Sequence, residues 1–153
     1  MNLNKTYITI ILFILFFVII EKIEAQIAVV VNKDNPVENL TSVELKRIYL
    51  GRITTFINDE QIMLVQYEPL SEKFYHLLLH KTPMKVRKHW ISVVFSGGDG
   101  TPPKESKTVE QVFKLIKENP GAISFLDLND VSNEMKLLTI DRKQPQDDEY
   151  FFK

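Results

Sequence analysis

The sequence contains no cysteine, only five glycines and no surplus of charge of either sign. Without cysteine, disulfide bonds, thiolate catalysis and cysteine-ligated zinc sites are excluded. Lysine and arginine number 19 against 20 aspartates and glutamates, so the formal net charge is −1 and we expect no nucleic-acid partner. Five glycines and seven prolines leave no room for a low-complexity segment. What is present in the 153 residues is the composition of one ordinary globular domain.

The chain begins with a short apolar run, from Tyr7 to Ile20. Lys5 precedes the run and Ala25 follows it, which is the order of a secretory signal peptide, and the run is short for a membrane span. We therefore expect residues 1–25 to be a cleaved signal peptide and the mature protein to be periplasmic or secreted. Because Ile23 is large for its place near the cleavage site, an uncleaved anchor is the alternative, and only then would the protein contact the membrane.

Apolar runs and amphipathic patterns alternate through the rest of the chain. A capping box, Thr41 with Glu44, indicates the start of one helix, and Ser71, Pro83 and Thr108 indicate three more. Strands are predicted at residues 26–32, 61–67, 121–126 and 135–140, and the continuous apolar character of the first indicates burial on both faces.

This alternation predicts an α/β domain over residues 26–142, with a small, largely parallel sheet flanked by helices. The last segment, residues 143–153, is polar apart from three aromatic residues, and we expect it to be a loosely ordered tail.

Six short phrases occur in an order that resembles a known family. They are Asn35-Pro36-Val37, Leu40 to Gly51, Ile62 to Val65, His89-Trp90 leading to Phe95-Ser96-Gly97, Thr101-Pro102-Pro103, and Pro120 to Phe125. The set resembles the phosphate-binding proteins of ABC transporters, and more closely their short single-lobe relatives. The resemblance implies a single lobe of the periplasmic-binding-protein type II fold. Full-length members close two such lobes around an anion.

The resemblance also implies a ligand, a small oxyanion such as phosphate held by hydroxyl and amide donors. Family members follow the second strand of this lobe with an arginine and a Ser-Gly-Thr turn, of which this chain retains only Ser71. Glu68 and Glu72 stand where the anion would sit, and their charge opposes it. The candidate ligand-binding residues are Ser71, Thr41 and Ser42, and for each of them the alternative is a helix cap.

Other polar groupings give no further site. His76 and His80 lie four residues apart on one predicted helix, but no third ligand lies within sequence range, so we assign no metal and no cofactor. The turn from Ser96 to Thr101 could wrap an anion, although a helix end is the simpler interpretation. No nucleophile with a base and no acid pair stands out, so we assign no catalytic residues and expect no enzymatic activity.

Two functional hypotheses follow. The first is an exported, non-enzymatic, solute-binding-like protein that binds an oxyanion weakly. The second is a lobe without a ligand that docks onto an envelope protein or onto a second copy of itself. Basic residues gather in the middle of the chain, where they form either a solvated helix face or a docking surface for an acidic partner: Lys81, Lys85, Arg87, Lys88 and Lys104.

Overall fold

The computed structural model describes residues 25–153, so the expected signal peptide lies outside the described residues except for Ala25. Within this range, none of the helices combines the length and the apolar character that crossing a bilayer requires.

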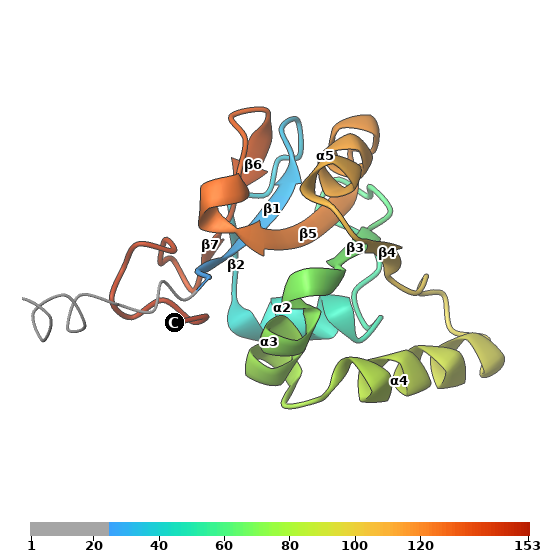
Figure 1. Cartoon of the computed structure of the whole chain (residues 1–153). Helices are drawn as coiled ribbons and strands as arrows, with labels where there is room; N and C mark the ends of the chain where they lie inside the picture. Colours follow the sequence, from blue (N-terminus) through green and yellow to red (C-terminus); the bar gives the residue numbers. More distant parts are fainter. Residues whose placement is uncertain (1–24) are drawn as a thin grey trace, which may run out of the picture.

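Five strands form the central sheet, in the order β4-β3-β5-β1-β6 (Figure 1). The strands β3, β4 and β5 are parallel neighbours, whereas β1 runs antiparallel to both β5 and β6. Four of the five strands therefore point the same way, in agreement with the predicted, largely parallel sheet. The bounds are β1 (Ile27–Asn32), β3 (Met63–Tyr67), β4 (Lys104–Ser106), β5 (Ala122–Asp127) and β6 (Met135–Leu137).

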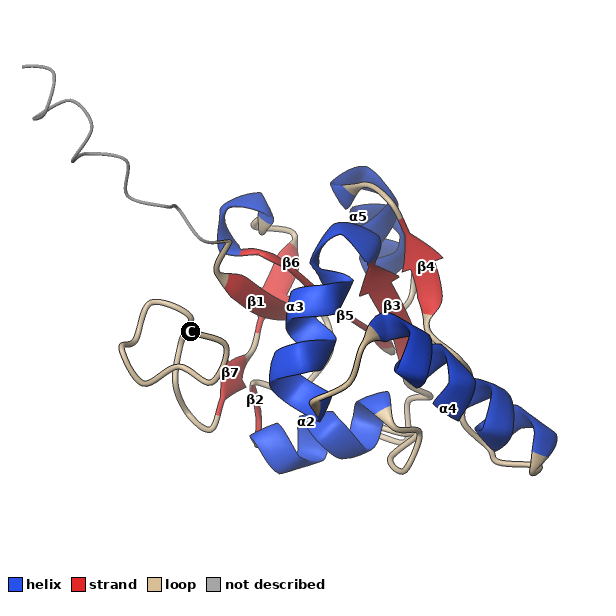
Figure 2. Ribbon diagram, turned by 60° about the horizontal axis from the view of Figure 1, so that its bottom comes forward, coloured by secondary structure: helices blue, strands red, loops and turns tan. Residues whose placement is uncertain are grey.

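Helices cover both faces of this sheet (Figures 1 and 2). On one face lies α5 (Val109–Glu118), and on the other lie α2 (Ser42–Tyr49) and α3 (Glu68–Leu79), with α4 (Pro83–Phe95) beside them. Side chains of β1 alternate between the two cores: Val29 and Val31 pack with α2 and α3, and Val30 packs with α5. Both faces of β1 are buried, as its continuous apolar run predicts.

Three details differ from the sequence-based expectations. The predicted strand at 135–140 is broken, because β7 (Thr139–Ile140) leaves the main sheet and pairs in parallel with β2 (Asn39–Leu40). The short strand β4 lies in a stretch for which we predicted no strand, and it follows two prolines. A single turn of 3-10 helix, η1 (Leu128–Asp130), follows β5.

Two of the phrases that carry the family resemblance meet in space. The buried side chain of Asn35 donates from Nδ2 to the carbonyl of Pro120 at 3.1 Å, and its Oδ1 accepts from the amide of Val37 at 3.0 Å. Next to this contact, Gly121 lies against the backbone of Gln61, and an added Cβ would fall 2.0 Å from the carbonyl oxygen of that residue. These two phrases therefore contribute to the packing of the domain.

The expectation of a loosely ordered tail requires correction for its aromatic residues. Tyr150 and Phe152 are buried in the larger core cluster. The ring of Phe152 stacks on Phe74 with centroids 5.2 Å apart, and Phe74 stacks in turn on Phe125 of β5 at 3.8 Å. Residues 150–152 thus complete the core on the α3 side of the sheet. The polar residues around them had led us to expect a loosely ordered segment.

Replacing Phe152 by alanine should therefore lower the free energy of unfolding by about 3–5 kcal/mol, because a fully buried aromatic ring leaves a cavity when it is removed. Urea unfolding followed by circular dichroism measures this loss. Lys153→Ala, at an exposed neighbouring position, is the control and should change stability by less than about 0.5 kcal/mol. Equal stability of the two variants would contradict the observed packing of the tail.

Candidate functional site

The hydroxyl of Ser71 is used inside its own helix. Helix α3 begins at Glu68, three residues before the start that we expected, so Ser71 lies in the first turn and does not cap the helix. Ser71 is buried, and its Oγ donates to the carbonyl of Glu68 at 2.8 Å. An oxyanion at this position would have to displace that hydrogen bond and approach the acidic side chain in the same turn.

The other two candidates lie at a different place, after the small β2–β7 sheet, where the start of α2 is occupied by the protein's own acidic groups. The carboxylate of Glu44 accepts from both the amide and the hydroxyl of Thr41, each at 2.8 Å. The amide of Glu44 donates back to the Thr41 hydroxyl at 3.1 Å, which completes the predicted capping box. The amide of Ser42 donates to Oδ1 of Asp141 at 2.9 Å. Carboxylates therefore already fill the positions that a bound anion would take.

The remaining sequence candidates serve as helix ends or connections. His80 ends α3 in the left-handed conformation, with φ of 53°, and within residues 25–153 no group of three His, Cys, Asp or Glu residues could hold a metal ion. Gly97 and Gly98 donate their amides to the carbonyls of Val94 and Val93, so the turn after α4 is the helix end that the sequence favours.

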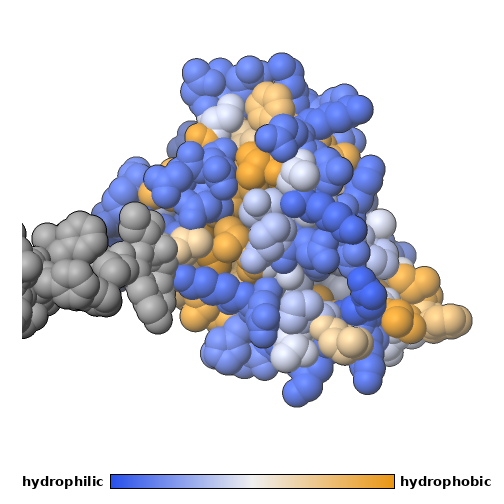
Figure 3. All heavy atoms as spheres, viewed as in Figure 1, coloured by the Kyte–Doolittle hydropathy of each residue, from blue (hydrophilic) through white to orange (hydrophobic). Residues whose placement is uncertain are grey.

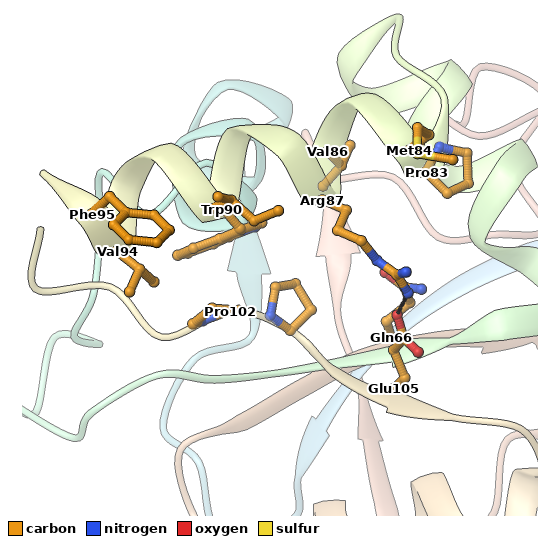
Figure 4. Close-up of a pocket in the computed structure, with 12 residues that line it drawn as sticks. Gln66, Pro83, Met84, Val86, Arg87, Trp90, Val94, Phe95, Pro102 and Glu105 are labelled. Carbon is orange, nitrogen blue, oxygen red and sulfur yellow. Dashed lines mark hydrogen bonds and ion pairs between the residues drawn. The ribbon is translucent and has the colours of Figure 1, made fainter.

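A groove lined mainly by apolar side chains lies between α4 and the segment that leads into β4 (Figure 4). It has a cavity volume of about 510 Å³, within the usual range of protein binding sites. Trp90 and Val94 face Pro102 across the groove, with Phe95 at one end and an ion pair between Arg87 and Glu105 toward the other. The rest of the lining consists of Gln66, Pro83, Met84, Val86, Ile91 and Pro103.

The position of α4 is fixed by Trp90, the only tryptophan of the chain. Its indole ring lies against Gly51 and Gly100, where an added Cβ would fall 2.7 Å and 2.9 Å from ring atoms. Gly51 also has a φ of +69°, which favours glycine. A second link joins the same elements, because Nε2 of His89 lies 3.0 Å from the carbonyl of Leu50, a geometry in which this nitrogen donates.

Helix α4 carries two apolar stripes. Val86 and Trp90 face the core, with Val93 packed beside them, and this stripe is enough to hold the helix. The second stripe faces solvent: Met84, Ile91, Val94 and Phe95 are each more than half exposed, and Phe95 is 87% exposed. Figure 3 shows hydrophobic atoms on the surface at the far end of α4. The apolar surface of α4 therefore extends beyond the stripe that the core covers, and an apolar helix surface normally packs against a partner.

Our sequence analysis did not identify this groove. The available signal was the surplus of apolar residues in α4, which is larger than one buried face can use. The second wall of the groove could not be anticipated in the same way, because its position depends on the pairing of β4 with β3.

The charged side chains of α4 are all basic. Helix α4 contains Lys85, Arg87 and Lys88 and no acidic residue, and both lysines are exposed. The guanidinium of Arg87 pairs with Glu105, whereas no ion pair to Lys85 or Lys88 is found within residues 25–153. At the inner side of the groove, the hydroxyl of Tyr75 donates to Gln66 at 2.7 Å, and burial raises the pKa of Tyr75 above its ordinary value. The groove is thus an apolar cleft along a basic helix, and its two charged lining residues pair with each other.

The fold is that of phosphate-binding proteins of ABC transporters. The chain is similar to an ABC-type phosphate transport receptor from Vibrio cholerae, with 22% identity over 83% of this chain and a TM-score of 0.66. It is also similar to a putative phosphate ABC transporter substrate-binding protein from Clostridium perfringens, solved with bound phosphate, with 22% identity over 78% of this chain and a TM-score of 0.62. A third similar structure is PstS from Borrelia burgdorferi, with 18% identity over 79% of this chain and a TM-score of 0.59. No protein-family model matches the sequence.

The matches cover 52%, 46% and 49% of those three proteins, so this chain spans about half of their length. At these identities the likeness establishes the fold. It confirms the family resemblance seen in the sequence and the prediction of an α/β domain built as a single lobe of the periplasmic-binding-protein type.

The capping interaction at α2 should make stability depend on pH in a defined direction. The backbone amide and then the hydroxyl of Thr41 hold the pKa of Glu44 below its ordinary value of 4.5. A lowered pKa in the folded state stabilises the protein fully above the unfolded value, and this contribution disappears as the pH falls through the folded value. Glu44→Gln should therefore lose roughly 0.3–1 kcal/mol at pH 7, and the difference from the wild type should shrink below about pH 4.5.

Chemical unfolding of both proteins between pH 7 and pH 3 measures this difference. Glu38→Gln, at an exposed position outside the helix, is the matched control and should stay within about 0.5 kcal/mol of the wild type at pH 7. A Glu44→Gln difference that grew toward low pH would contradict the capping role.

Proposed function

We propose that this chain is an exported, non-enzymatic interaction module, a single lobe of a solute-binding fold that docks onto another macromolecule through the groove beneath α4. The observation that carries this proposal is the outward apolar stripe of α4 above a cleft of about 510 Å³. Export is supported by the signal-like run that begins the sequence. A non-enzymatic role is supported by the names of the similar structures, a transport receptor and substrate-binding proteins.

The energetic argument rests on Phe95. An aromatic side chain buries on the order of 200 Å² when it is fully covered, and Phe95 is 87% exposed. Fully burying an apolar side chain of this kind is worth about 1.5–3 kcal/mol before the costs of association. Met84, Ile91 and Val94 extend the same face, and contiguous exposed patches of this kind mark interaction sites.

The occupied helix starts also favour docking over anion binding. In α2 the anion positions are taken by Glu44 and Asp141, and in α3 the hydroxyl of Ser71 is turned onto its own helix. A lone lobe would in addition leave an anion exposed to water, where each charged hydrogen bond contributes little. In the groove beneath α4, by contrast, no described side chain fills the space that a partner would take.

A second candidate function is weak binding of an oxyanion such as phosphate. It is favoured by the similarity to a structure that contains bound phosphate. Its ligands would be Ser71, or Thr41 with Ser42, after exchange of their present partners, and a second copy of the chain or an envelope protein could shield the anion. This candidate requires saturable phosphate binding that Ser71→Ala weakens.

The docking proposal is tested by photo-crosslinking in the cells that produce the full chain. A photoreactive amino acid at position 91, in the exposed stripe, should give one discrete adduct, and adding Val94→Gln should abolish it because the same apolar contact is lost. The matched control is position 57, since Ile57 is 85% exposed and lies outside the groove. Equal labelling from both positions, or none from position 91, would contradict docking through this face.

A further inference from the structure

The chemistry of the groove points to one kind of occupant, and this step rests on the docking function proposed above. We infer that the groove accepts an amphipathic helix from another protein, with apolar residues on its contact face and acidic residues beside them. Three features of the described structure carry this inference: the spacing of the exposed stripe, the prolines in the opposite wall, and the sign of the charge on α4.

The exposed stripe has the spacing of a helix–helix seam. Met84, Ile91 and Val94 of this stripe stand at i, i+7 and i+10, with Arg87 at i+3 between the first two, which is the a and d spacing of a coiled coil with one charged d position. All four residues line the groove, and Arg87 contributes its aliphatic stem while its guanidinium pairs with Glu105. Helix α4 has 13 residues and is about 20 Å long, enough to align with a partner helix over three turns.

The opposite wall disfavours an extended occupant. A peptide that joins the sheet as an added strand would have to pair with the edge strand β4, which has only three residues. Directly before β4 stand Pro102 and Pro103, which have no amide hydrogen to donate. A helix needs no main-chain pairing, and it can place side chains between α4 and the two prolines (Figure 4).

The basic character of α4 favours a partner helix with acidic residues. With Met84 and Ile91 at a positions, Lys88 occupies the e position, where interhelical ion pairs form, and α4 carries no acidic residue. Glutamate or aspartate beside the apolar face of a partner would pair with Lys88. Two copies of α4 would instead bring like charges together, which disfavours a second copy as the occupant.

Two other occupants fit less well. The apolar run from Tyr7 to Ile20 contains no charged residue, and β1 begins on the side of the molecule away from α4 in both views (Figures 1 and 2). A bilayer is flat on this scale, and the seam residues line a concave cleft that a flat surface cannot fill.

A designed peptide tests the inference directly on residues 25–153, which contain every residue of both core clusters. The probe is a fluorescein-labelled helix of about three heptads, with leucine at a and d and glutamate at e and g. At low salt it should bind with a Kd below about 100 μM, seen as a rise in anisotropy and, with unlabelled peptide, as a change in Trp90 fluorescence. A peptide with lysine in place of every glutamate should bind at least about tenfold more weakly.

Variants of the seam and of the basic residue beside it should change the affinities for the acidic and the basic peptide differently. Ile91→Gln should weaken the acidic peptide at least about tenfold, because it removes the centre of the seam. Lys88→Glu should weaken the acidic peptide and strengthen the basic one. Ile57→Gln, an equal loss of exposed apolar surface outside the groove, should leave both affinities unchanged. Thermal melts of each variant establish that it is folded, as expected for exposed positions.

Each other result overturns the inference. Equal affinity for both peptides, or no binding of the acidic one, removes the acidic helix as occupant. A wild-type dimer in sedimentation that Ile91→Gln dissociates assigns the groove to a second copy, and flotation with phosphatidylglycerol vesicles that Ile91→Gln abolishes assigns it to a membrane. If the peptide fails while position 91 still crosslinks in cells, docking stands and only the occupant is wrong; if both fail, both proposals fall.

Discussion

The packing of Trp90 against two neighbouring glycines is the contact on which the rest of this account depends. Because Gly51 and Gly100 leave room for the indole ring, the inner stripe of α4 docks on the core and its outer stripe is held toward solvent. The same glycine-lined contact ties α4 to the loops after α2 and before β4, and Trp90 itself lines the groove. A side chain at either glycine would push the ring away and shift the whole helix. The groove is therefore a consequence of the packing of the domain.

A binding fold can persist after its binding groups have been redirected. The similar structures are phosphate-transport proteins of which this chain spans about half, whereas here the helix starts are occupied by Glu44, Asp141 and the internal bond of Ser71. Internal caps of this kind stabilise helices that have no ligand to complete them. The outer apolar side chains of α4, by contrast, are exposed and have no partner within the described residues.

The fold could be read from the sequence because its signals are local. The apolar run of β1, the capping box at Thr41 and the Pro-Gly turn before β5 each specify one element, and the structure contains all three. The phrases that resemble the family are of the same kind, since Asn35, Gly121 and Trp90 act in packing. The site could not be read in this way. The groove requires the placement of β4 against β3, and the burial of Phe152 requires the stacking of Phe74 and Phe125, contacts between residues far apart in the chain.

The central claim is that the chain binds through the face of α4 and not through its helix starts. Amide chemical-shift mapping of the ¹⁵N-labelled protein during a phosphate titration tests this most directly, because it reports on every helix start at once. The account predicts no saturable shifts at residues 42–44 or 69–72 up to millimolar phosphate, while the acidic peptide shifts residues 83–95 and 102–105. Saturable phosphate shifts at either helix start, with α4 unaffected by the peptide, would contradict it.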